Sequence, residues 1–156
     1  MVERPAGCVY NPFVMTGNDA LILWPMLAHI GLVFFLYVWL TVARVGAVKR
    51  GEVDYSCYQF GDGEPLQAAR ISRNLSNQFE LPVIFYAMVL LLILLDRVTA
   101  IDVIAAWVFV AGRLIHSAVQ TLTANVPLRG NVFTINFLAV VVLVGHMLMI
   151  AFESVR

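Results

Sequence analysis

The sequence has few charged residues and almost no lysine. Only 13% of its 156 residues are charged and 61% are hydrophobic, whereas a typical soluble domain is about 25% charged. Lys49 is the single lysine, beside nine arginines, and the formal net charge is zero. There is no basic excess of the kind that binds nucleic acid, so we expect no nucleic-acid partner. These shortages exclude an ordinary soluble domain and predict an integral membrane protein with a single domain over residues 1–156.

Cysteine is also scarce. Cys8 and Cys57 provide neither a disulfide framework nor the spacing of a metal site, and we expect them to lie on opposite sides of the membrane, unpaired. The first apolar run is too long for a signal peptide and has no clear cleavage site. We therefore expect it to remain as a transmembrane helix.

Four apolar runs are each long enough to cross a bilayer, which takes about 20 residues. They predict an all-α fold, a four-transmembrane-helix bundle with helices at about residues 20–48, 65–95, 100–123 and 132–152. Pro82 lies inside the second run and should kink that helix just beyond Glu80. The segment Thr123–Asn131 contains Pro127 and Gly130 and predicts a turn before the fourth helix.

Polar residues interrupt the second and third runs at helical spacing. Arg70, Arg73, Asn77 and Glu80 are three, four and three residues apart, which places them within about a quarter turn of one helix face. The third run carries Arg113, His116 and Gln120 at the same kind of spacing. Charges at membrane depth are costly unless they face protein or a water-filled cavity. The two faces therefore line a polar cavity or, alternatively, only lock one helix to its neighbours by ion pairs.

The basic residues are distributed unevenly along the chain. Most of them flank the first and third connections, and the positive-inside rule then places both termini outside and the first connection in the cytoplasm. The polar residues of the spans fall in the cytoplasmic half: Arg44, Arg70, Arg73, Asn77, Glu80, Arg113, His116, Gln120 and Arg129. The sequence thus predicts a net-positive cavity that opens to the cytoplasm.

The motif Arg70-x-x-Arg73-x-x-x-Asn77-x-x-Glu80-x-Pro82 resembles the signature of the MAPEG family, the membrane-associated proteins of eicosanoid and glutathione metabolism. Arg113-x-x-His116 resembles the third helix of the prostaglandin synthase branch, and Pro127-x-Arg129 resembles the turn that opens the fourth helix. The resemblance extends over all four predicted helices.

This resemblance implies a homotrimer that binds glutathione between neighbouring subunits. It implies glutathione contacts from Arg44, Arg73, Asn77, Glu80, His116 and Arg129. The chemistry fits, because arginines suit the two carboxylates, Glu80 suits the α-ammonium and Arg129 suits the thiolate. The implied function is a glutathione-dependent transferase or peroxidase that acts on a lipophilic electrophile from the bilayer.

Two departures from the family pattern leave a second function open. Gln120 and Phe133 stand where several family enzymes carry tyrosines that contact glutathione, and Gly130 stands where the prostaglandin synthase has a serine. They favour a catalytically weak or inactive membrane scaffold or lipid-binding subunit. A small transporter is a weaker alternative, since the chain has no two-half repeat. His29 and His146 fall in the outer half of their spans and could form a metal or haem pair, although membrane histidines more often make packing hydrogen bonds.

Overall fold

The protein is a bundle of long helices, described by a computed structural model at residues 17–59 and 63–155. The prediction of an all-helical fold is confirmed, and the described residues contain no strand. The elements are α1 Asn18–Lys49, the short 3₁₀ helix η1 Tyr55–Tyr58, α2 Leu66–Asn77, α3 Leu81–Leu94, α4 Ala100–Leu122 and α5 Val126–Ser154. Four segments are long and apolar enough to span a membrane, with α2 and α3 together forming the second.

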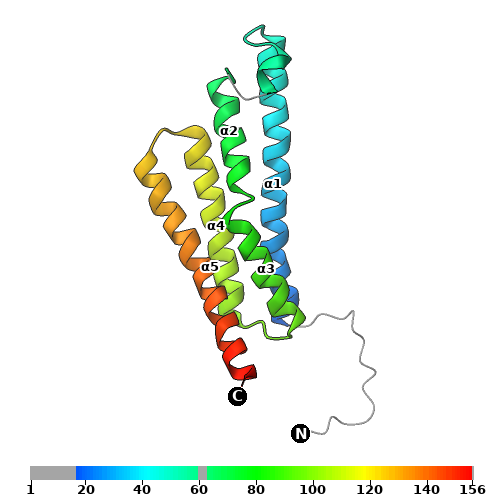
Figure 1. Ribbon diagram of the computed structural model, residues 1–156, viewed down its shortest axis with the longest axis vertical. Coiled ribbons are helices and arrows are strands. Elements are labelled where there is room, and N and C mark those ends of the chain that lie inside the picture. The colour runs from blue at the N-terminus through cyan, green and yellow to red at the C-terminus, as the bar shows by residue number, and fades with distance from the viewer. Residues whose placement is uncertain (1–16, 60–62, 156) are drawn as a thin grey trace, which may run out of the picture.

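The four spans run antiparallel in chain order (Figure 1). We call one end of the bundle the loop end, where α1 ends, α2 begins and α4 connects to α5. At the opposite end, called here the terminal end, α1 begins, α3 ends and α5 ends. Between the two ends α2 and α3 follow one another with a break about halfway along the bundle (Figure 1).

The break in the second span covers residues 78–80. Pro82 stands in the first turn of α3, where its missing N–H and its ring prevent the helix from continuing through the preceding turn. The helix is therefore interrupted over residues 78–80, and this break ends at the point just beyond Glu80 where the sequence predicted a kink. As a result, Asn77 is the last residue of α2, and Gln78 and Glu80 lie in the non-helical break between α2 and α3.

The α4–α5 connection is shorter than the sequence predicted, because α5 begins at Val126 rather than at residue 132. The side chain of Asn125 caps the helix by accepting a hydrogen bond from the Leu128 N–H at 3.0 Å, and Pro127 suits the first turn of a helix. Gly130 is thus helical. Arg129 therefore lies in the first turn of α5, whereas the sequence predicted it in the turn that precedes the fourth helix.

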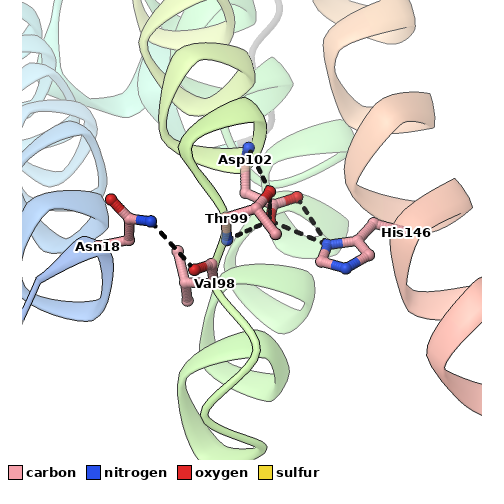
Figure 2. Close-up of polar contacts among 5 residues, drawn as sticks. All are labelled: Asn18, Val98, Thr99, Asp102 and His146. Atoms are coloured by element: carbon pink, nitrogen blue, oxygen red, sulfur yellow. Dashed lines mark hydrogen bonds and ion pairs between the residues drawn. The ribbon is translucent and has the colours of Figure 1, made fainter.

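At the terminal end, α4 begins with a reciprocal cap (Figure 2). Asp102 accepts hydrogen bonds from the backbone N–H of Thr99 at 2.8 Å and from its hydroxyl at 2.7 Å, while the Asp102 N–H donates to that hydroxyl. His146 of α5 lies 2.9 Å from the same carboxylate. This cluster ties the α3–α4 turn to α5.

The apolar core has two parts. One lies toward the terminal end and includes Ile22, Phe85 and Phe109; the other lies between α1 and α2 and includes Leu36 and Ile71. Large apolar side chains also cover the outer faces of the helices, as expected for a bundle whose surroundings are lipid.

Candidate functional site

A polar cavity of about 300 Å³ lies between α2, α4 and α5, toward the loop end. Eight residues line it: Arg73, Asn77, Glu80, Arg113, His116, Arg129, Gly130 and Phe133. We call it the arginine cavity. It brings together six of the nine site residues that the sequence predicted, from three spans.

Each element contributes to the arginine cavity for a local reason. Arg73 and Asn77 are four residues apart on α2, so they project from the same face. Glu80 follows in the break before α3. Arg113 and His116 are three apart on α4, and Arg129 lies in the first turn of α5. That turn adds the positive end of a helix dipole to the cavity.

Arg113 is almost fully buried yet lines the cavity. Its Nε and Nη2 lie 3.1 and 2.9 Å from Oε1 of Gln78, and Nη2 also donates to the backbone oxygen of Asn77 at 2.5 Å. All these acceptors are neutral oxygens. Arg113 is therefore held firmly without a carboxylate partner among the described residues.

Two buried polar atoms near the cavity lack partners within residues 17–59 and 63–155. One is Nδ1 of His116, whose ring lies beside Phe133 with centroids 6.3 Å apart. The other is Nε2 of Gln120; its Oε1 accepts a hydrogen bond from Asn77 at 2.9 Å. Unpartnered buried polar groups are costly, so these atoms are suited to a ligand that supplies the missing hydrogen bonds.

The arginine cavity is electropositive. It contains Arg73, Arg113 and Arg129 against the single carboxylate of Glu80, three positive charges and one negative. None of these four groups takes part in an ion pair within the described part of the chain. Such a site suits a ligand with two or more anionic groups and one cationic group.

Arg70 and Gln120, two further predicted residues, line a second, smaller cavity of about 210 Å³. Arg73 and Arg129 line this cavity too, so it adjoins the arginine cavity toward the α4–α5 turn. The two hollows together contain eight of the nine predicted site residues.

Arg44, the ninth predicted site residue, lines neither of these two cavities within a single chain. Its guanidinium pairs with Glu64 at 2.7 Å, lies 3.5 Å from the Ser72 hydroxyl and stacks 5.0 Å from the centre of the Tyr58 ring. It thus fastens the first connection to the end of α1. In the same connection, the hydrogen bond from exposed Arg50 lowers the pKa of Glu52 below its ordinary value.

Gln78 is the important residue that the sequence reasoning missed. It is 1% exposed and contacts Arg113 directly. A signal was present, since Asn74 and Gln78 are four apart and mark a second polar stripe on α2. His29 and His146 do not meet: His29 bonds Tyr86 and Gln78, and His146 bonds Asp102.

Comparison of the sequence with models of protein families gives a match. The sequence model of the MAPEG family matches residues 22–149, which covers most of the chain and all of the cavity residues. The chain belongs to the MAPEG family. No curated protein and no solved structure matches it. Membership in the MAPEG family fits a membrane protein of glutathione-related or eicosanoid metabolism.

MAPEG proteins generally use glutathione, and the residues of the arginine cavity fit that molecule. Glutathione carries two carboxylates, an ammonium and a thiol. Among the described residues, the cavity has three arginines and one carboxylate without ion-pair partners and the unpartnered Nδ1 of His116. The match is one of charge and of hydrogen-bonding capacity.

Proposed function

We propose that this protein is a glutathione-dependent membrane transferase or peroxidase that acts on a lipophilic electrophile. The observation that carries the proposal is the set of three arginines, none of them ion-paired among the described residues, around a single carboxylate in a membrane-embedded bundle. Placing unpaired charges there costs free energy. A ligand with anionic groups for the arginines and a cationic group for Glu80 offsets that cost. Glutathione, with two carboxylates and one ammonium, is such a ligand.

The proposed roles follow from the chemistry of each group. Arg73 and Arg113 bind carboxylates, Glu80 binds the α-ammonium, and Asn77 and His116 hydrogen-bond the peptide. Arg70 and Gln120, in the adjoining cavity, complete the binding site. A thiol with a pKa of about 8.5 is mostly protonated at neutral pH, so the reaction needs a fixed cation beside the sulfur. Arg129 has that role, supported by the N-terminus of α5.

The assembly that we propose is a homotrimer with the site between subunits. Arg44 supports this arrangement, since one chain leaves it away from both cavities; in a trimer it can approach the site of a neighbouring copy. Light scattering in mild detergent, corrected for bound detergent, should report three chains per particle. A monodisperse monomer would remove the shared site.

The orientation that we propose has both termini outside and the loop end in the cytoplasm, from the bias of arginines toward that end. Gln59→Cys, introduced into a chain without its native cysteines, should react with a membrane-impermeant reagent only from the cytoplasmic side. Labelling from outside in intact cells would reverse the orientation.

Glutathione titration of the purified protein tests the function directly. We expect saturable binding and an ultraviolet absorbance of bound thiolate at neutral pH, followed by turnover with a generic electrophile. The alternative is a scaffold or lipid-binding subunit that keeps the family fold. Phe133 supports it, because this apolar ring lines the cavity and offers no hydroxyl to the thiol. Binding without thiolate or turnover would establish the scaffold.

A further inference from the structure

A buried polar cluster extends from the arginine cavity into the middle of the bundle, and the proposed chemistry does not use it. It contains His29 of α1, Gln78 of the break and Tyr86 of α3, beside Arg113 of α4. His29 is 0% exposed and Gln78 is 1% exposed. In Figure 1 the break that carries Gln78 lies about halfway along the bundle. Polar groups at this depth require partners within the protein.

Gln78 is the centre of this cluster. Its Oε1 lies 3.1 and 2.9 Å from Nε and Nη2 of Arg113 and 3.1 Å from Nε2 of His29. Its Nε2 donates to Asn74 Oδ1 at 3.0 Å and to the Ser117 hydroxyl at 3.2 Å. An arginine can only donate hydrogen bonds. The contacts with Arg113 therefore fix which way the Gln78 amide is turned.

His29 is oriented by the same logic. Its Nε2 must donate to Gln78 Oε1, so Nδ1 of the neutral ring is an acceptor and receives the Tyr86 hydroxyl at 2.6 Å. Phe85 and Phe109 pack around the imidazole, with ring centroids 6.3 and 5.6 Å away. Tyr86 thus donates to His29, and His29 and Arg113 both donate to Gln78 Oε1. The result is a continuous chain of hydrogen bonds that ends at the Arg113 guanidinium.

This chain holds Arg113 without neutralising it. Two neutral oxygens, of Gln78 and Asn77, accept from Nε and Nη2. The hydrogen bonds of Arg113 within residues 17–59 and 63–155 involve only Nε and Nη2, so Nη1 stays without a partner there. Arg113 also lines the cavity. Arg44, Arg50 and Arg97, in contrast, each bind a glutamate. A glutamate at position 78 could accept the same hydrogen bonds from Arg113, but its carboxylate would neutralise the positive charge of the guanidinium.

We propose that Gln78, oriented by His29 and Tyr86, is a positioning residue that fixes Arg113 and leaves its charge for an anionic group of the ligand. The inference deepens the proposed function and rests on it for the identity of that ligand. The proposed effect is preorganisation, because the Arg113 guanidinium is already fixed in place and need not rearrange when the anionic group binds.

Gln78→Glu tests the proposal with almost no change of shape. The new carboxylate pairs with Arg113. Asn74 can turn its amide so that Nδ2, which has no partner among the described residues, donates to this carboxylate. We expect glutathione affinity to fall about tenfold or more, the effect of losing a hydrogen bond to a charged group. The thermal midpoint should be unchanged or higher. Gln59→Glu, the same replacement in the exposed first connection, is the matched control and should change neither.

A loss of affinity without a loss of thermal stability separates a positioning role of Gln78 from a structural role. Parental affinity in Gln78→Glu would overturn the inference, and so would a parallel loss of affinity and thermal midpoint. If this variant does not fold, Arg113→Lys replaces it: the charge remains but the double contact to Gln78 is lost, and parental affinity there would overturn the inference.

Two further arms complete the experiment. His29→Leu removes a donor to Gln78 and should weaken binding, whereas His29→Gln can still donate and should restore part of the affinity; equal affinities would exclude a role for His29. If the parent binds no glutathione, the proposed function fails by itself. The same variants are then titrated with inorganic phosphate, and weaker phosphate binding by Gln78→Glu than by the parent still supports the free charge of Arg113.

Discussion

The terminal end and the arginine cavity differ in how their charged groups are partnered. At the terminal end, Asp102 is 1% exposed and its carboxylate accepts from Thr99 and contacts His146 (Figure 2). On the surface of the same end, Arg97 pairs with Glu153 at 2.6 Å. In the arginine cavity toward the loop end, Arg73, Arg129 and Glu80 have no such partners within the described residues.

This difference separates structural charge from charge kept for a ligand. Paired groups at the terminal end satisfy one another and fasten α4 to α5 and to the preceding turn. Charged groups of the cavity that have no ion-pair partner among the described residues contribute nothing of this kind to the fold, and an unpaired charge at membrane depth is costly. The comparison therefore predicts that substitutions at the two ends change different quantities, binding and turnover at one end and stability at the other.

The largest effect is expected from Arg129→Leu. Removing the fixed cation should reduce turnover with a generic electrophile by about a hundredfold or more, the usual loss when one preorganised stabilising group is removed. It should also raise the pH at which bound thiolate absorbs in the ultraviolet. Arg129→Lys should retain part of the activity, because the charge survives without the planar geometry.

The matched control for this experiment is Arg97→Leu, an identical replacement at the terminal end. Since Arg97 is engaged with Glu153 on an exposed surface, turnover should stay at the parental value. Equal losses in the two variants would mean that Arg129 has no special relation to the thiol, and parental turnover in Arg129→Leu would remove it from the reaction.

A smaller effect is expected from Glu80→Gln, which leaves the ligand ammonium without its carboxylate. A hydrogen bond to a charged group is worth about 1.5–3 kcal/mol, so glutathione affinity should fall about tenfold or more in a calorimetric titration. Glu153→Gln should bind like the parent. If Glu80→Gln binds normally but no longer assembles into the parental oligomer, Glu80 has a structural function and the contrast between the two ends is lost.

Much of the arginine cavity could be predicted from the sequence, because it depends on spacing along single helices. Apolar runs longer than a bilayer predicted four spans, and spacings of three and four predicted that Arg73 and Asn77, and likewise Arg113 and His116, share a face. The MAPEG resemblance is confirmed by the family match. The arginine cavity joins these two faces to Arg129.

Contacts between distant segments could not be read in this way. Gln78 and His29 form a buried pair across 49 positions of the chain, and helical periodicity carries no information on which side chains of two helices meet. The resemblance implied a glutathione contact from Arg44. Within one chain Arg44 pairs with Glu64 instead, and its approach to the site of a neighbouring copy stays a prediction. The prediction also placed the start of the fourth helix too late, at about residue 132. The Asn125 cap starts α5 at Val126.

A loss of stability without a loss of binding is expected at the terminal end, from Asp102→Asn. The isosteric amide keeps one oxygen for the cap of α4 but loses the charge shared among Thr99 and His146. Hydrogen bonds to charged groups contribute about 1.5–3 kcal/mol, so the thermal midpoint should fall by several degrees. Arg97→Gln, at an exposed pair worth about 1 kcal/mol or less, should lower it less. Glutathione affinity should equal that of the parent in both variants, because neither residue lines the arginine cavity. A loss of affinity in Asp102→Asn without a loss of stability would show that the two ends are coupled, and buried charge at the terminal end would then serve binding as well as structure.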